Sequence, residues 1–291
     1  MTVHGPADGW VEGPDGQRFW GRAGAAGLLA VDAGRVLLQH RVSWSHFGGT
    51  WGLPGGARAS DEGAVAGALR ESAEEAAVPP GSLEVAFTSV LDLGFWSYTT
   101  VVARVTTPFE PVISDAESTE LAWVPLDEVE DLPLHPGLAA SWRGLRDQLD
   151  RRLLLVVDAA NVVGQRPDGW WRDRVGATDR VLAALDRAAE EGWPASWFGL
   201  DGSGPGAPTR VWAPALAVVE GRARGVGDPL GAVRVERAAA DGDAAVVAAV
   251  RSASERVAVV TADRGLADRV RAEGAEVVPP SALLAQLDAA G

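Results

Sequence analysis

The strongest constraint on the fold is the alternation of short apolar segments with helical stretches in the second half of the chain. Each apolar segment has the length of a buried strand, and helical composition lies between several of them. Such alternation predicts a parallel sheet covered by helices. The predicted strands are Leu153–Val157, Ala195–Leu200, Leu216–Val219, Val233–Val235, Val257–Val260 and Glu276–Val278, and the predicted helices are Thr178–Glu191, Asp243–Ala253 and Arg264–Glu273.

The first half has a different pattern, with strands and turns on either side of one long helix. The chain has 291 residues, about twice the usual domain size, so two domains are expected. Because the pattern changes near 150–152, we predict α/β domains at 1–150 and 151–291. In the first half we predict strands at Gly27–Asp32, Arg35–Gln39, Val85–Leu91, Thr99–Val105 and Leu121–Val124, and helices at Asp61–Ala77, with Ser60 as N-cap, and Pro136–Leu149.

Composition excludes several classes of function. The chain has no cysteine, which excludes disulfides, thiolate zinc sites and cysteine nucleophiles. All four histidines lie in the first half, and the net charge of −14 argues against sequence-independent binding of duplex nucleic acid. The longest apolar run, Ala244–Val250, is far shorter than the ~18 residues of a membrane span. With no export signal after Met1, we expect a cytoplasmic protein with no membrane partner.

Residues 55–78 read GGARASDEGAVAGALRESAEEAAV, a glycine loop followed by an acidic helix. Spacings of three and four place Glu71, Glu74 and Glu75 on one face, where like charges repel by about 0.2–0.5 kcal/mol per pair. The helix dipole also disfavours anions in these last turns. A divalent cation bound among the carboxylates would reverse both effects, because Mg²⁺ prefers oxygen ligands. The alternative is a solvated acidic face.

The spacing of this stretch resembles the Nudix box: a glycine, five residues, Glu, seven residues, Arg-Glu, an aliphatic, any residue, Glu-Glu, any residue, glycine and an aliphatic. The residues that match in register are Gly56, Glu62, Arg70, Glu71, Glu74, Glu75 and Val78. Ser72 replaces the first aliphatic and Ala77 the closing glycine, for which we expect altered packing rather than lost chemistry. The resemblance covers about residues 22–149 and implies a Nudix-type α/β/α sandwich with a mixed sheet.

The resemblance also implies roles for individual residues. It implies Mg²⁺ or Mn²⁺ held by Glu71, Glu74, Glu75, the carbonyl of Gly55 and, outside the box, Glu117 as a further ligand or base. Arg70 is then expected to orient the carboxylates and Glu62 to support the loop. Glu120 is the second choice for the outlying acid. The metal would activate water for displacement at phosphorus in a nucleoside diphosphate linked to another group.

Four aromatic residues near the predicted strands allow two interpretations. Trp44, His46, Phe47 and Trp96 are candidates for stacking on a base, but aromatics in such places more often belong to the core.

In the second half, acidic residues follow the predicted strands. Asp158 follows Leu153–Val157, Asp201 follows Leu200, Asp263 lies just beyond the strand ending at Val260, and Asp243 opens a helix. In a parallel sheet, residues just past the carboxyl ends of strands line the binding crevice. With no histidine available, these acids indicate a metal-dependent phosphodiester site. Helix capping is the alternative explanation, since aspartate is a common cap.

These segments resemble the PIN-like nuclease superfamily, in particular its NYN branch. The matching pieces are VVDAANVVG at 156–164, FGLDG at 198–202, DGDAAVV at 241–247 and VVTADRGLADRV at 259–270. The resemblance implies a PIN-like domain with a metal held by Asp158, Asp201, Asp243 and Asp263, and cleavage of single-stranded RNA. Related domains often carry paired acids at the helix start, whereas Ala244 follows Asp243 here, which puts cleavage in doubt. Candidate RNA contacts are Arg166, Trp170, Trp171, Arg172, Arg174 and Arg264.

We therefore interpret the chain as a divalent-metal-dependent Nudix hydrolase with a C-terminal PIN/NYN-like domain that cuts or binds RNA. One alternative is a non-catalytic, nucleotide-sensing regulator. The other is a ribonuclease in which the Nudix half provides specificity.

Overall fold

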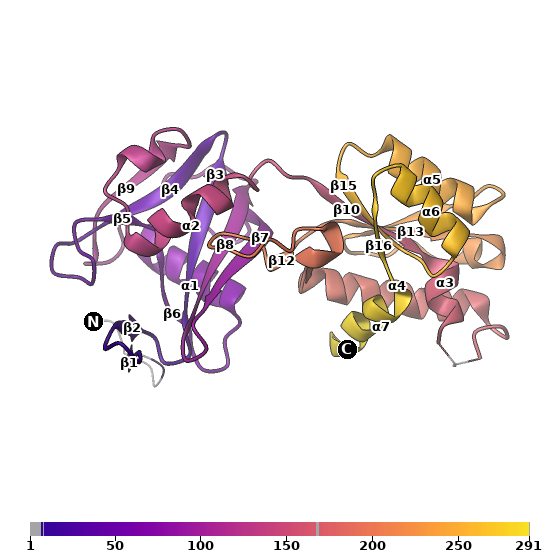
Figure 1. Cartoon of the computed structure of the whole chain (residues 1–291), viewed down its shortest axis with the longest axis horizontal. Coiled ribbons are helices and arrows are strands. Elements are labelled where there is room, and N and C mark those ends of the chain that lie inside the picture. The colour runs from indigo at the N-terminus through magenta and orange to yellow at the C-terminus, as the bar shows by residue number, and fades with distance from the viewer. Residues whose placement is uncertain (1–6, 8, 167–168, 291) are drawn as a thin grey trace. The chain divides into compact units, whose positions relative to one another are not determined.

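The computed structural model describes residue 7 and residues 9–166 and 169–290 (Figure 1). The chain folds into two compact units, one formed by Met1–Leu149 with Asp201–Thr209 and the other by Asp150–Leu200 with Arg210–Gly291. The short segment Asp201–Thr209 belongs to the first unit because it packs there: the N–H of Thr209 donates to the carbonyl of Thr88 at 2.7 Å.

The first unit is built on a mixed sheet with the strand order β7-β8-β3-β4-β5, in which β6 also pairs with β3 and β9 with β4. The pair β3–β8 is parallel and the other pairs are antiparallel. A separate hairpin joins β1 to β2. The strands are β1 (Trp10–Glu12), β2 (Arg18–Trp20), β3 (Ala25–Asp32), β4 (Arg35–Arg41), β5 (Trp51–Gly52), β6 (Gly55–Ala57), β7 (Leu83–Asp92), β8 (Ser97–Val105) and β9 (Ser118–Pro125).

Helix α1 (Ala64–Ala76) covers one face of this sheet, where it packs against alternate residues of β3, among them Leu28. Leu29 and Val102, which point to the opposite face, are also buried, so both faces are covered. Helix α2 (Pro136–Arg146) and the 3₁₀ helix η1 (Val129–Asp131) complete the unit.

The second unit contains a parallel sheet, as the alternating pattern predicts. Its strand order is β14-β13-β10-β15-β16. The strands are β10 (Leu153–Asp158), β13 (Ala215–Val219), β14 (Val233–Arg237), β15 (Arg256–Val260) and β16 (Glu276–Val278), with a small antiparallel pair of β11 (Trp193–Pro194) and β12 (Arg210–Val211).

Helices cover both faces of this parallel sheet (Figure 1). α5 and α6 pack on one face, around Val156 and Val259, while α3, α4 and α7 lie on the other. The helices are α3 (Ala159–Gly164), α4 (Arg174–Glu190), α5 (Gly242–Ser252), α6 (Arg264–Ala272) and α7 (Pro280–Ala289), with 3₁₀ helices η2 (Ala195–Phe198) and η3 (Gly221–Gly225).

Two sequence predictions about local structure are wrong. The predicted strand Ala195–Leu200 is the 3₁₀ helix η2, whose buried Ala195 and Phe198 are three residues apart, the period of that helix. Ser60 is not the N-cap of α1, because the helix starts after Gly63. Helices α3 and α7 were not predicted.

In the described part of the chain, no helix combines the length and hydropathy that a bilayer crossing needs.

Candidate active site

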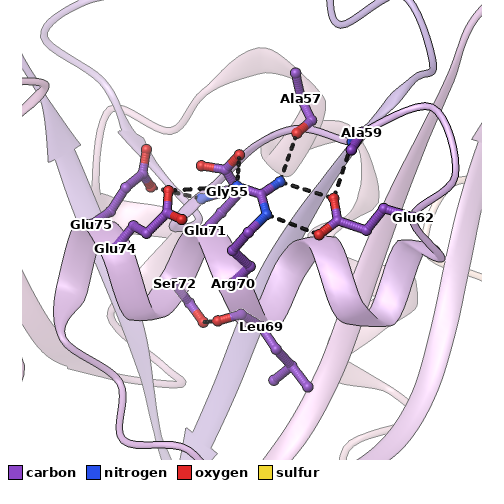
Figure 2. A network of polar contacts seen from close by, with 10 residues as sticks. All are labelled: Gly55, Ala57, Ala59, Glu62, Leu69, Arg70, Glu71, Ser72, Glu74 and Glu75. Atoms are coloured by element: carbon purple, nitrogen blue, oxygen red, sulfur yellow. Dashed lines mark hydrogen bonds and ion pairs between the residues drawn. The ribbon is translucent and has the colours of Figure 1, made fainter. Parts of the chain in front are cut away.

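Arg70 is the centre of the polar network at the glycine loop (Figure 2). Its Nε and Nη2 donate to the two carboxylate oxygens of Glu62 at 2.8 and 2.9 Å, and Nη2 also donates to the carbonyl of Ala57 at 3.1 Å. Its Nη1 donates to Glu71 at 2.8 Å. This two-pronged contact holds the pKa of Glu62 below its usual range and raises that of Arg70, so the loop is fixed to α1 by a strong ion pair.

Glycine is required at Gly55, where the loop passes the sheet. A Cβ on Gly55 would overlap the backbone of Ala26 and Gly27 in β3, so the loop approaches this strand more closely than a residue with a side chain would allow. A Cβ on Gly56 would lie 2.7 Å from Cδ of Glu71 and would displace its carboxylate.

Glu75 is the buried acid of this site, with only 8% of its surface exposed. Its Oε2 accepts the N–H of Gly55 at 2.8 Å and lies 3.4 Å from Nε2 of Gln39. Burial, followed by the charges of Asp115 and other nearby carboxylates, raises the pKa of Glu75 to about 8, against the lowering effect of the Gly55 N–H. The protein itself therefore leaves most of this negative charge uncompensated.

Two further acids, Asp115 and Glu117, lie beside Glu75. One carboxylate oxygen from each of the three lies within 4.8 Å of the others. Ser118 connects them to the sheet, since it accepts from Gln39 at 2.7 Å and donates to Asp115 at 2.8 Å. Sequence reasoning missed Asp115.

The other candidate acids differ in their surroundings. Glu71 is half-buried, and burial raises its pKa against the effect of Arg70. Glu74 is exposed and lies 3.5 Å from Nη1 of Arg70, which offsets part of the repulsion expected on this face. Glu120 is exposed and pairs across the sheet with His40, outside the cluster of Glu75, Asp115 and Glu117.

This geometry suits a divalent cation. A buried carboxylate with a raised pKa beside two other carboxylates is a set of hard oxygen donors with unbalanced charge, which Mg²⁺ or Mn²⁺ would neutralise. The residues present therefore fit a metal of this class.

Comparison with known proteins identifies the family. The family described as NUDIX domain matches residues 21–145. A Mycobacterium tuberculosis protein named "Putative 8-oxo-dGTP diphosphatase 3" is 53% identical over 156 residues, which are 50% of this chain and 71% of that protein. The chain belongs to the Nudix family. As a Nudix hydrolase, it acts on phosphoric anhydride bonds.

Two other relatives each match about half of this Nudix protein. A Bifidobacterium longum "Nucleoside triphosphate pyrophosphatase/Nudix hydrolase fusion protein" is 42% identical over 158 residues, 51% of this chain and 33% of that protein. The crystal structure of RenU, a Nudix hydrolase from M. smegmatis, is 51% identical and covers 48% of this chain and 93% of its own, with a TM-score of 0.45.

Next to the acidic cluster, the Nudix domain carries an aromatic loop, residues 42–50. Trp44 is 70% exposed and Phe47 45% exposed, so these two are not core residues. Phe47 has a φ of 55° and packs edge-on against His135 at 4.8 Å. Arg41 ties the loop to the acids: its Nε donates to the carbonyl of His46, and its Nη2 lies 4.0 Å from Glu117. Trp96, by contrast, is partly buried and donates to the carbonyl of Trp20.

In the second unit, Asp158 and Asp263 lie at neighbouring strand ends. Asp158 is buried and accepts from Nδ2 of Asn161 at 2.6 Å and from Oγ1 of Thr261 at 3.0 Å. Asp263 caps α6 through the N–H of Leu266 at 2.8 Å. Burial, followed by the charges of Asp263, Asp241 and Asp158, raises the pKa of Asp243, while Arg269, whose Nη1 lies 3.6 Å from Asp243, lowers it.

Asp201 differs from the other predicted acids of this group. It is exposed, follows η2 rather than a parallel strand, and belongs to the first unit. The strand-end argument therefore does not apply to it.

The candidate RNA contacts are spread over the second unit. Arg174 stacks on Trp170 at 4.9 Å, Trp171 is 59% exposed, Arg172 and Arg264 are exposed, and Arg166 pairs with Asp288 at 2.8 Å.

Proposed function

We propose that the Nudix domain hydrolyses a nucleoside diphosphate linked to another group, with Mg²⁺ or Mn²⁺ as cofactor. The observation that carries this proposal is the cluster of Glu75, Asp115 and Glu117, in which a buried carboxylate is left with unbalanced charge. A diphosphate would add negative charge to the same place, so its binding also calls for a cation.

The proposed ligands come from the glycine loop, α1 and the segment before β9. They are the carbonyl of Gly55 and the carboxylates of Glu71, Glu74, Glu75 and Glu117, to which the geometry adds Asp115. The metal would supply an activated water and neutralise charge at phosphorus. Arg70 holds Glu71 in place while Glu62 holds Arg70, so removal of either partner would misplace the acid.

The aromatic loop supports a nucleotide as substrate. Exposed Trp44 and Phe47 are planar surfaces on which a base can stack, and Arg41 joins this loop to the acidic cluster. The name of the M. tuberculosis relative places oxidised nucleotides such as 8-oxo-dGTP among the substrates to test. We propose the cytoplasm as the location of this activity.

A substrate screen of the whole chain tests this proposal. Nucleotide sugars, dinucleotides and oxidised nucleotides would be incubated with Mg²⁺, with Mn²⁺ and with a chelator. We expect metal-dependent release of a nucleoside phosphate from at least one class, lost in the Glu74→Gln/Glu75→Gln double variant and kept in Glu120→Gln. Tight nucleotide binding without turnover by the wild type would instead favour the nucleotide-sensing regulator.

We propose, as a second function, that the C-terminal unit is a PIN/NYN-like domain that binds or cuts single-stranded RNA. In open parallel sheets, ligands bind where the strand order reverses. Here the chain moves outward from β10 to β13 and β14, then returns to β15 on the other side, so β10 and β15 flank that point. Asp158 and Asp263 stand at their carboxyl ends, coupled to Asp243, which supports the proposal.

Cleavage of a labelled single-stranded RNA with Mn²⁺ or Mg²⁺ tests this second function. We expect Asp158→Asn and Asp243→Asn to lose cleavage while diphosphate hydrolysis survives, and Asp268→Asn, an exposed acid of α6, to keep both. If the wild type binds RNA through the same acids but does not cleave it, the unit is an RNA-binding domain and not a nuclease. A wild type that neither binds divalent metal in this unit nor contacts RNA would refute it.

A further inference from the structure

A basic groove lies between α4 and α7 in the second unit, away from the aspartate cluster, and it includes Arg166, one of the candidate RNA contacts. The two helices lie side by side (Figure 1). The groove is lined by Arg166, Arg180, Ala183, Ala184, Arg187, Leu287 and Asp288. Ala184 and Leu287 are buried and form an apolar floor, while Arg180 and Arg187 are exposed.

The charge of this groove is opposite to that of the protein. Three arginines and one aspartate are among the described residues that line the groove, in a chain whose net charge is −14. Arg180 and Arg187 are seven residues apart on α4, close to two full turns, so both side chains emerge on the same side of the helix. The small side chains of Ala183 and Ala184 between them leave space for a ligand.

Arg166 supplies the observation that favours an anionic ligand in the groove. Its Nη2 donates to Asp288 at 2.8 Å, so one face of the guanidinium is satisfied. Its Nε, however, is buried and has no acceptor among the described residues. Nε and an Nη of the same guanidinium form a planar fork that matches two oxygens of a phosphate or carboxylate. An oxyanion in the groove would give this buried donor a partner.

We propose that this groove binds the phosphate group of a phosphate ester, with Arg166, Arg180 and Arg187 as its contacts. Phosphate fits better than a carboxylate, because three arginines line the groove and a phosphate offers them more charge and more acceptor oxygens. The phosphate belongs either to the backbone of a single-stranded nucleic acid or to a small nucleotide. The proposal goes beyond the proposed functions, since it needs neither diphosphate hydrolysis nor the aspartate cluster.

Titration calorimetry of the full chain in metal-free buffer tests the proposal with three probes: inorganic phosphate, UMP and an oligouridylate. The test variant is Arg180→Gln/Arg187→Gln, which removes the charges of two exposed arginines of α4 and keeps the ion pair between Arg166 and Asp288. The control is Arg222→Gln/Arg234→Gln, which removes two exposed arginines of the same unit outside the groove. Thermal unfolding of all three proteins shows whether the fold is retained.

We expect the test variant to bind phosphate-bearing probes at least tenfold more weakly than the wild type and the control variant. If the source is a nucleic acid, the oligouridylate binds far more tightly than UMP. In the test variant, the slope of log K against log salt concentration then becomes shallower by about 1.4, which is ~0.7 for each lost phosphate contact. If the source is a small nucleotide, UMP binds as well as the oligomer. Equal binding by the test variant and the wild type, or no binding to the wild type, would overturn the proposal.

Discussion

The two units of the chain each gather carboxylates, yet they treat the buried one in opposite ways. In the Nudix unit, Glu75 accepts the N–H of Gly55 at 2.8 Å and a longer contact from Nε2 of Gln39 at 3.4 Å, and nearby carboxylates raise its pKa. In the second unit, Asp158 receives hydrogen bonds from the backbone and side chain of Asn161 and from Thr261. Burial alone therefore does not mark a metal site. The number of donors that the protein offers to the buried acid separates the two cases, and it makes Glu75 the stronger candidate for a cation.

The largest expected effect is that of Glu75→Gln on diphosphate hydrolysis. Loss of a residue that merely supports a metal ligand costs about 10–100-fold, so loss of the buried ligand should cost more than about a hundredfold. Without metal, the variant should be as stable as the wild type or more so, because it replaces an acid whose pKa is raised by burial with a neutral amide, whose oxygen still accepts from Gly55. Turnover and chelator-treated thermal unfolding measure the two effects. A clear loss of stability in Glu75→Gln would contradict the proposed difference between Glu75 and Asp158.

His135 makes the two units respond differently to acid. Its Nδ1 accepts the N–H of Gly137 as the N-cap of α2, and burial, followed by the charge of Arg41, lowers its pKa to about 4. The folded protein therefore holds this histidine neutral while the unfolded chain takes up a proton below about pH 6.5. The contribution of His135 to stability is fully present above pH 6.5 and falls by up to about 3 kcal/mol as the pH drops to 4.

Unfolding curves between pH 7 and 4 test this effect. His135→Asn keeps an acceptor at the N-cap but cannot titrate, so it should lose less stability than the wild type over this range. His40→Asn serves as the control and should follow the wild type. If the free energy of unfolding falls with pH equally in the wild type and in His135→Asn, His135 is not the source of this acid sensitivity.

In the second unit, Asp158→Asn should lower the free energy of unfolding by about 1–3 kcal/mol. In either orientation the new amide nitrogen faces a donor of Asn161, because the backbone N–H and Nδ2 of Asn161 donate to the two different oxygens of Asp158. This sign is opposite to that expected for Glu75→Gln, so a pair of denaturant titrations compares the units directly. No loss of stability would mean that Asp158 is held less firmly than its contacts indicate.

The smallest effect concerns helix ends. Ala77 ends α1 with a φ of 52°, in the left-handed region, at the place where the Nudix box has glycine. Ala77→Gly should stabilise the protein by about 1 kcal/mol, since a left-handed non-glycine residue costs roughly 1–2 kcal/mol. Gly199 ends η2 in the same conformation, and there the reverse change, Gly199→Ala, should destabilise because a Cβ would meet Arg256. Chemical denaturation measures both, and equal stability of Ala77→Gly would count against strain at α1.

The sequence predicts most of the strands and helices and the box itself, because these depend on local patterns. Spacing along a helix also fixes which side chains share a face. Local sequence patterns did not locate the start of α1. Glu62 stays in the loop, where it accepts from Ala59 and holds Arg70, and this delays the helix until Ala64.

Asp115 could not be predicted because its position depends on distant strand pairing. The β4–β9 ladder shifts register between His40 and Arg41, and Ser118 lies close enough to bond to both Gln39 and Asp115. An acid two residues before Glu117 carries no local signal of this contact. The strand predicted at Ala195–Leu200 failed for a related reason, since a short apolar run fits a buried strand or a buried 3₁₀ turn equally well.

The central claim is that the cluster around Glu75 binds a divalent cation, and Mn²⁺ titration of the full chain, followed by electron paramagnetic resonance of the free ion, tests it most directly. Wild type, Glu75→Gln and Glu120→Gln would be compared at pH 7.5. The account predicts that Glu75→Gln loses one bound Mn²⁺ while Glu120→Gln binds as the wild type does. An unchanged number and affinity of Mn²⁺ sites in Glu75→Gln would contradict it.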